Sequence, residues 1–193
     1  MATKARIIHQ EYVYDGFFKM QAYDFWVPFQ TQEGGQELHR LVFERGHAVA
    51  VLPYDPVTKE VLLVREFRSG MMAAGDDPFS DALVAGMIDA GEAASDAALR
   101  EMVEETGQKA AMLEEIHAGA YVSPGGTSER IALYYAEMDL SQAGGTHGEV
   151  NEGEDILSVK YDVHEFVTQC VSGQISDMKT VLAGIWLARK LGL

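Results

Sequence analysis

The order of apolar and polar residues predicts a strand-rich beginning to the chain. Ile7–Tyr14 and Phe17–Phe29 are rich in β-branched and aromatic residues, and Asp15-Gly16 between them is typical of a two-residue hairpin turn. A second turn at Gly34-Gly35 precedes a third expected strand, Glu37–Glu44. Three short strands with this many aromatic residues cannot bury both faces alone. We therefore expect them to pack on the rest of the chain or on a second copy.

From Gly46 onward the pattern mixes strands and helices. The expected strands are His47–Pro53, Glu60–Phe67, Ala82–Ala85, Leu113–Val122, Arg130–Met138 and Ile156–Tyr161. The expected helices are Ala94–Thr106, His164–Val171 and Ser176–Leu191, and the expected loops are Met71–Ser80 and Gln142–Glu154. Strands and helices do not alternate regularly, so the order favours an α+β fold or a mixed-sheet sandwich.

Composition narrows the class of protein. A chain of 193 residues is long enough for one domain with a small appendage. Its 30 acidic and 15 basic residues give a formal charge of −15, which argues against nucleic acid or an anionic membrane as a partner. Cys170 is the single cysteine, so no intrachain disulfide can form. The first residues show no apolar signal core and no run is long enough to span a bilayer, so we expect a cytoplasmic protein.

One segment carries candidate chemistry. Its fixed positions are Gly86, Glu92, Arg100, Glu101, Glu104, Glu105 and Gly107. On a helix, Glu101 lies three residues from Glu104 and four from Glu105, so the three carboxylates share one stripe. Such like charges repel, and a hard divalent cation such as Mg²⁺ or Mn²⁺ would reverse that penalty because it prefers carboxylate oxygen. Arg100 beside the stripe could orient a carboxylate through a bidentate pair.

A solvated helix face is the usual meaning of an acidic run, and for Glu104-Glu105 alone it is the better interpretation. The full spacing is different, because seven fixed residues recur by chance at on the order of 10⁻⁸ per position. The segment resembles the Nudix box, G-x5-E-x7-R-E-U-x-E-E-x-G-U, in which U is a bulky aliphatic residue. Met102 stands at the first U, whereas Gln108 at the last U departs from the pattern.

Other motifs are similar to those of bacterial ADP-ribose pyrophosphatases within the Nudix superfamily. They are Gly16-Phe17-Phe18, residues 43–47, residues 123–130 and residues 151–156. The resemblance implies a Nudix α/β/α sandwich with a mixed central sheet, residues 46–193, and an N-terminal antiparallel sheet, residues 1–45, that forms a homodimer. It also implies hydrolysis of ADP-ribose to AMP and ribose 5-phosphate with Mg²⁺, or Mn²⁺, as cofactor. The alternatives are another nucleoside diphosphate sugar, such as GDP-mannose or ADP-glucose, and a domain that senses ADP-ribose without cleaving it.

The same resemblance implies roles for individual residues. The expected metal ligands are Glu101, Glu104, Glu105, Glu154 and the backbone carbonyl of Ala85. Glu152 is the expected general base, acting in a catalytic set with Glu101, Glu105 and Arg100. The expected substrate contacts are Phe17, Arg40, Arg68, Met87 and Glu129. From composition alone, the acidic loop is more simply solvated and the arginines fit surface ion pairs. Phe17 fits a core or interface residue, and Glu129 a strand cap.

Overall fold

The computed structural model describes residues 4–148 and 153–193, and the chain divides into two compact units. The first consists of Met1–His47 and Tyr121–Arg130, and the second of Ala48–Ala120 and Ile131–Leu193. Each unit is built around its own β-sheet.

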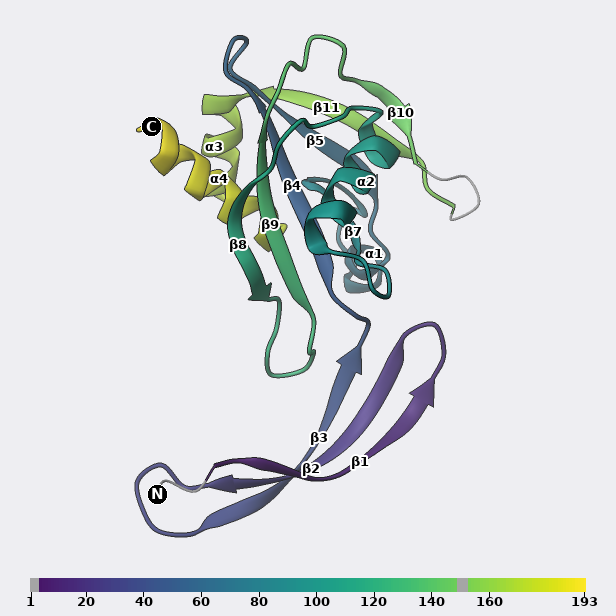
Figure 1. Cartoon of the computed structure of the whole chain (residues 1–193), viewed down its shortest axis with the longest axis vertical. Helices are drawn as coiled ribbons and strands as arrows, with labels where there is room; N and C mark the ends of the chain where they lie inside the picture. The colour runs from purple at the N-terminus through teal and green to yellow at the C-terminus, as the bar shows by residue number, and fades with distance from the viewer. Residues whose placement is uncertain (1–3, 149–152) are drawn as a thin grey trace. The chain divides into compact units, whose positions relative to one another are not determined.

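The first unit contains a three-stranded antiparallel sheet in the order β1-β2-β3 (Figure 1). Its strands are β1 (Arg6–Asp15), β2 (Lys19–Pro28) and β3 (Gly35–Glu44). The segment before Arg130 joins this sheet, because the Phe43 N–H donates to the Gly126 carbonyl at 2.8 Å and the Thr127 hydroxyl donates to the Phe43 carbonyl at 2.9 Å. All ten residues of β1 are exposed. The predicted N-terminal antiparallel sheet is confirmed.

The second unit contains an eight-stranded mixed sheet whose main path runs β10-β11-β5-β4-β9-β8, with β6 beside β5 and β7 beside β4. Its strands are β4 (Ala48–Asp55), β5 (Glu60–Phe67), β6 (Phe79–Ala82), β7 (Val84–Met87), β8 (Glu114–Tyr121), β9 (Arg130–Glu137), β10 (Gly145–His147) and β11 (Ile156–Asp162). β4 pairs with β9 in parallel and with β5 and β7 in antiparallel fashion, so the predicted mixed central sheet is confirmed.

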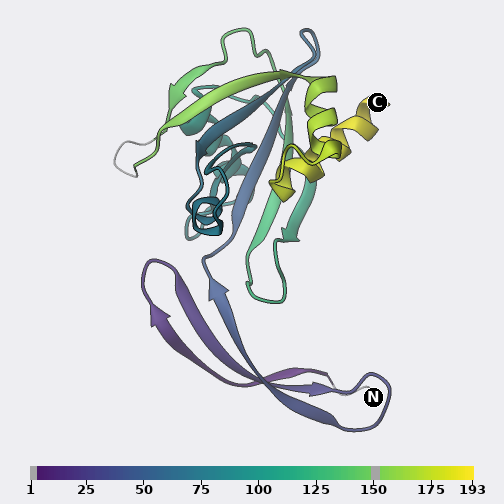
Figure 2. The same cartoon turned by 180° about the vertical axis from the view of Figure 1, so that it is seen from behind.

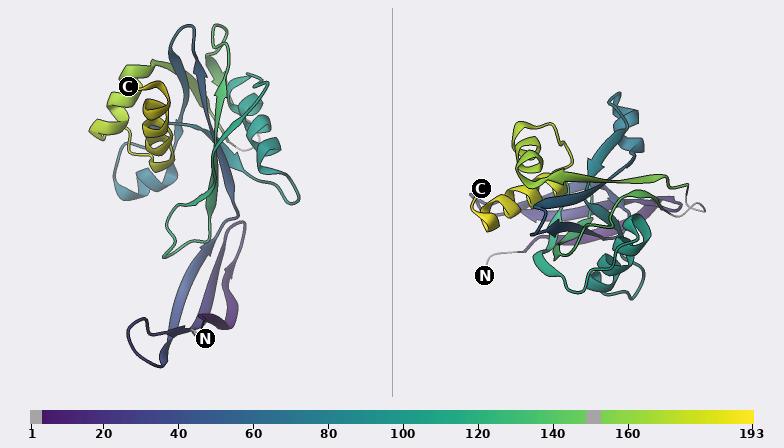
Figure 3. Two further views of the ribbon diagram at one scale, coloured as in Figure 1. Left: turned by 60° about the vertical axis from the view of Figure 1, so that its left-hand side comes forward. Right: turned by 90° about the horizontal axis from the view of Figure 1, so that it is seen from above.

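Helices cover both faces of this sheet (Figures 1 and 3). The helices are α1 (Ser69–Ala74), α2 (Ala94–Thr106), α3 (Val163–Ser172) and α4 (Met178–Leu191). Strand side chains alternate between the faces, so in β4 Val49 and Val51 pack in the core under α2, whereas Ala50 and Leu52 pack in the core under α3 and α4. Figure 2 shows α3 and α4 on the face opposite α2. No helix in residues 4–148 and 153–193 is long and apolar enough to cross a membrane.

The expected loop Met71–Ser80 and the expected strand Ala82–Ala85 are wrong in detail. The short helix α1 begins after Arg68, whose carbonyl accepts hydrogen bonds from the N–H groups of Met71 and Met72. It ends at Gly75, where φ is 89°. β6 then pairs with β5, and the chain passes Leu83 to form β7 beside β4. These short elements depend on pairing with strands distant in sequence, which local periodicity does not reveal.

Candidate active site

Helix α2 presents both an apolar and an acidic surface. It begins after Ala93 and ends at Gly107, where φ of 66° suits glycine. Ala98 and Met102 are completely buried, as expected for its apolar side. Glu101 and Glu105 are also buried, with 8% and 3% of their surface exposed. Two of the three carboxylates of the stripe are therefore withdrawn from solvent, unlike a merely solvated acidic helix face.

Gly86 on β7 makes room for one of these carboxylates. A Cβ atom at this position would lie 1.9 Å from Oε1 of Glu101. Any side chain here would therefore displace the Glu101 carboxylate, and the first glycine of the motif is explained by this close approach.

Arg100 organises the surrounding acidic residues. Its Nη1 donates to Glu101 Oε1 at 2.7 Å and to Glu104 Oε2 at 2.9 Å. Its Nε donates to Glu92 Oε1 at 3.0 Å, and its Nη2 to the Met87 carbonyl at 2.9 Å. The hydrogen bond from Arg100 lowers the pKa of Glu92. Arg100 thus ties the loop after β7 to helix α2.

The pKa of Glu105 is shifted upward. Burial raises the pKa of Glu105 well above its ordinary value, and the charge of Glu66 raises it further. The hydrogen bond from the Ala85 N–H, at 3.0 Å to Oε2, acts in the opposite direction. Glu101 behaves similarly, because burial raises its pKa while Arg100 lowers it. The site therefore contains buried carboxylates, which are stabilised either by protonation or by binding a cation.

The donor set fits a divalent metal ion chemically, because carboxylate oxygens are the ligands that Mg²⁺ and Mn²⁺ prefer. Within the described part of the chain, no three His, Cys, Asp or Glu side chains are arranged as a ready-made metal site. In this arrangement Arg100 engages Glu101 and Glu104. The chemistry of a metal site is thus present, and side-chain rotations of these carboxylates would have to complete it.

The acidic loop before β11 contributes to the same electrostatics. The charge of Glu154 raises the pKa values of both Glu101 and Glu66. The Gly148 N–H donates to the Glu104 carbonyl at 3.2 Å, so the beginning of this loop is attached to α2. Glu152, the predicted general base, lies outside the described residues.

Glu66 is a residue of the site that sequence analysis missed. It lies near the end of β5, and Oε1 of Glu66 is 2.6 Å from Nη2 of Arg68. Burial raises the pKa of Glu66, and the charge of Arg68 lowers it. The available signal was the two-residue spacing from Arg68, because residues i and i+2 of a strand share a face.

The predicted substrate contacts divide between the two units. Arg68 and Met87 belong to the second unit, and the carbonyl of Met87 accepts a hydrogen bond from Arg100. Phe17, Arg40 and Glu129 belong to the first unit. Arg40 is exposed and donates from Nη1 to the His39 carbonyl at 2.7 Å.

A cluster in the first unit connects Phe17 with Glu129. Phe17 is 90% exposed, and its ring centroid lies 4.8 Å from that of Phe18. The guanidinium carbon of Arg45 lies 5.2 Å from the Phe18 ring centroid, and Nε of Arg45 lies 3.7 Å from Oε1 of the buried Glu129. Phe17 and Glu129 thus flank one aromatic and basic surface.

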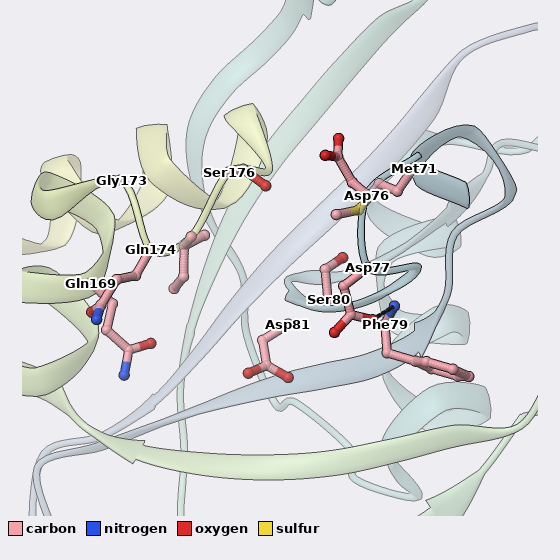
Figure 4. Close-up of a pocket in the computed structure, with 11 residues that line it drawn as sticks. Met71, Asp76, Asp77, Phe79, Ser80, Asp81, Gln169, Gly173, Gln174 and Ser176 are labelled. Atoms are coloured by element: carbon pink, nitrogen blue, oxygen red, sulfur yellow. Dashed lines mark hydrogen bonds between the residues drawn. The ribbon is translucent and has the colours of Figure 1, made fainter. Parts of the chain in front are cut away.

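A separate pocket of about 470 Å³ contains none of the predicted site residues (Figure 4). Asp76, Asp77 and Asp81 line one side and Gln169 and Gln174 the other. Asp81 is already engaged, because Arg65 donates to both of its carboxylate oxygens at 2.7 Å and the Tyr161 hydroxyl donates to it as well. The candidate active site is therefore the group of carboxylates on α2, not this pocket.

Comparison with known proteins identifies the family. The NUDIX domain model matches residues 44–174, which include the whole of α2 and the acidic loop. The chain belongs to the NUDIX family. The predicted resemblance, which started from the spacing of seven residues, is confirmed.

Several NUDIX relatives align along almost the whole chain. The ADP-ribose pyrophosphatase of Escherichia coli (strain K12) is 36% identical over 181 residues, which cover 94% of this chain and 86% of that protein. The ADP-ribose pyrophosphatase of Haemophilus influenzae is 37% identical over 186 residues, with 94% and 84% covered. The GDP-mannose pyrophosphatase of Salmonella arizonae is 31% identical over 188 residues, with 94% of each covered.

A solved structure supports the fold alone. The crystal structure of an ADP compounds hydrolase matches with a TM-score of 0.69 and 19% sequence identity, over 98% of this chain and 94% of that one. The predicted NUDIX architecture with an additional N-terminal sheet is therefore confirmed.

Proposed function

We propose that the protein is an ADP-ribose diphosphatase that hydrolyses the pyrophosphate bond of ADP-ribose to AMP and ribose 5-phosphate. The observation that carries the proposal is the NUDIX motif, with all seven fixed residues present, in which Glu101 and Glu105 are buried together on α2. The names of the relatives at 36% and 37% identity support ADP-ribose as the substrate. A GDP-mannose pyrophosphatase aligns at 31% identity, so GDP-mannose is the alternative substrate that the relatives support.

The proposed cofactor is Mg²⁺, with Mn²⁺ as a substitute. Glu101, Glu104 and Glu105, with Glu154 and the Ala85 carbonyl, would hold it. A divalent ion bound there neutralises pyrophosphate charge and lowers the pKa of a bound water. The burial of Glu105 supports this assignment, because a buried carboxylate without a counter-ion favours protonation.

In the proposed reaction, a water oxygen attacks one phosphorus of the pyrophosphate while Glu152 accepts the proton of that water. The bond from this phosphorus to the bridging oxygen breaks, and the bridging oxygen leaves with the other phosphate. The two products are AMP and ribose 5-phosphate. Arg100 orients Glu101 and Glu104 before the metal binds, which its hydrogen bonds to both carboxylates support.

The substrate contacts are proposed from the resemblance and the chemistry of each side chain. Phe17 offers an exposed ring for stacking on adenine. Arg40 and Arg68 offer guanidinium groups for phosphate or for the base. Glu129 would accept a hydrogen bond from the adenosine or the terminal ribose, and Met87 would line the pocket.

We further propose that residues 1–45 form a dimerisation element and residues 46–193 the catalytic domain of a cytoplasmic homodimer. The NUDIX match at residues 44–174 supports this division. The exposure of every residue of β1, including Tyr12, Val13 and Tyr14, supports a second copy as the partner of this sheet. The absence of a second cysteine beside Cys170 supports a reducing compartment.

The test is a comparison of ADP-ribose, ADP-glucose, GDP-mannose and NADH, each with Mg²⁺ and with a chelator, with chromatography of the products. We expect AMP and ribose 5-phosphate from ADP-ribose, a kcat/KM at least about tenfold above the other substrates, and no turnover with the chelator. Preference for GDP-mannose would refute the substrate assignment and keep the metal helix. Binding of ADP-ribose without cleavage of any substrate would identify a sensor and refute the enzyme.

A further inference from the structure

The end of strand β5 directs alternate side chains to opposite faces of the central sheet. Val64 belongs to the core under α2, whereas Leu63 belongs to the core under α3 and α4. Arg65 points away from α2, because it pairs with Asp81. By the two-residue period of a strand, Glu66 follows Val64 on the α2 face. Arg68, just beyond the strand, continues on that face, as its ion pair with Glu66 confirms.

The backbone of Arg68 is fixed on both sides. Its N–H donates to the Pro78 carbonyl at 2.8 Å, and its carbonyl accepts hydrogen bonds from Met71 and Met72 at 3.1 Å and 3.2 Å. The direction in which the side chain leaves the backbone is thereby set. The remaining freedom lies in the side-chain torsions, which carry up to about 2 kcal/mol of entropy for an arginine.

One nitrogen of the Arg68 guanidinium is buried without a hydrogen bond. Nη2 lies 2.6 Å from Oε1 of Glu66, an ion pair whose angles do not meet those of a hydrogen bond. Within the described part of the chain, Nη2 has no hydrogen-bond acceptor. A buried guanidinium nitrogen is unfavourable unless a charge or an acceptor compensates it. Glu66 supplies the charge, and the acceptor position is open to a ligand oxygen.

Both charges of the pair influence the carboxylate of Glu105 on α2. The charge of Glu66 raises the pKa of Glu105, and the charge of Arg68 lowers it. The Glu66 side chain is only 15% exposed, and that of Arg68 is 29% exposed. The Glu66–Arg68 pair is therefore within electrostatic range of Glu105, where the pyrophosphate of the proposed substrate would be held.

We propose that Glu66 is a positioning residue for Arg68, which it holds inside the site with Nη2 available to donate to a pyrophosphate oxygen. The proposal rests on the proposed function, because it takes Arg68 as a substrate contact. Without the charge of Glu66, the buried Nη2 loses the ion pair that compensates it, and the guanidinium turns toward solvent. Removing the charge of Glu66 has two opposite effects on substrate binding: Arg68 loses the attraction that positions it, and the pyrophosphate is no longer repelled by the Glu66 carboxylate. The first effect is the larger, because the proposed metal ions would already offset the charge of the pyrophosphate.

The test is a double-mutant cycle with Glu66→Gln, Arg68→Gln and the double variant, measured with ADP-ribose and Mg²⁺. Glu60→Gln is the matched control, because Glu60 lies on the same strand and pairs with Lys160 at 3.2 Å. We expect Glu66→Gln to raise KM about fivefold and to change kcat less than about twofold. We expect the double variant to match Arg68→Gln alone, because Glu66 acts only through Arg68. Glu60→Gln should equal the wild type.

Glu66→Asp keeps the charge and shortens the side chain, so its KM should lie between those of the wild type and Glu66→Gln, which separates positioning from a folding defect. An unchanged KM in Glu66→Gln overturns the proposal, as does a further loss when Glu66→Gln is added to Arg68→Gln. A fall in kcat at constant KM also overturns it, because Glu66 would then act on the reaction step itself. A wild-type protein that fails to cleave ADP-ribose refutes the proposed function, a result distinct from these.

Discussion

The two β-sheets of the molecule cover the apolar residues of their strands to opposite degrees. All eight residues of β4 are buried between helices of the same chain, whereas all ten residues of β1 are exposed. β4 is an almost continuous apolar run, whereas in β1 the apolar residues, such as Ile7, Tyr12 and Val13, are interspersed with charged and polar ones. The difference shows that strand composition predicts a sheet but not where its apolar surface is covered.

The two units also differ in which residues have an unusual degree of burial. The central unit buries Glu101 and Glu105, which ordinary partitioning would leave in water, and the N-terminal sheet exposes Phe17 and Tyr14, which it would bury. Each exception coincides with a proposed function: a cation would compensate the buried carboxylates, adenine would stack on Phe17, and a second copy would cover Tyr14. The comparison thus yields separate predictions for each unit.

The largest effect is expected in the central unit. Glu105→Gln keeps the size and the acceptor for the Ala85 N–H but removes the charge that would bind metal. We expect kcat for ADP-ribose to fall by about a thousandfold or more, with the fold retained by circular dichroism. Glu165→Gln, the same change at an exposed site on α3, should be fully active. Normal turnover in Glu105→Gln would contradict the metal assignment.

A smaller effect, confined to association, is expected in the N-terminal sheet. Val13→Lys places a charge on the exposed apolar surface of β1 and should weaken the homodimer about 30-fold, because interface burial of that charge costs about 2 kcal/mol. Light scattering across a dilution series should show a wild type of twice the 21.2 kDa chain mass and a variant that dissociates earlier. Val57→Lys, at the exposed turn between β4 and β5, is the control. A wild type that is monomeric would contradict the proposal that a second copy covers the exposed apolar residues of β1.

The smallest expected effect is a pH dependence of stability. Burial raises the pKa of Glu105 in the folded state above its unfolded value, so the protonated acid favours the fold. This contribution is complete below the unfolded pKa and is lost as pH rises through the folded pKa. In chelator, Glu105→Gln should therefore become more stable than the wild type as pH increases from about 4 to 8, measured by urea unfolding. A difference that is constant across this range would contradict the burial of an uncompensated charge.

Features with a strong local signal were predicted well. The expected helix Ala94–Thr106 agrees with α2 at both ends, because apolar spacing and Gly107 mark its course. The pairing of β1 with β2 followed from the Asp15-Gly16 turn. The carboxylate stripe followed from helical periodicity, and the family from the fixed spacing around it.

Features that depend on distant neighbours were not predicted. Glu101 is buried because Gly86 lies against its carboxylate, and this burial cannot be predicted from the local sequence of the helix. Glu66 joins the site because the fold brings its charge close enough to Glu105 to raise the pKa of that residue, although 39 positions separate the two along the chain. The pairing of β6 with β5 likewise depends on the assembled sheet. Sequence motifs therefore located the acidic helix, and the tertiary fold supplied its partners.

The most direct test of the central claim is Mn²⁺ binding measured by electron paramagnetic resonance, without nucleotide, in the wild type, Glu105→Gln and Glu165→Gln. We expect the wild type and Glu165→Gln to bind Mn²⁺ with equal affinity and Glu105→Gln to bind it at least about tenfold more weakly. Equal binding in all three proteins, or none in the wild type, would contradict the conclusion that the buried carboxylates of α2 form a metal site.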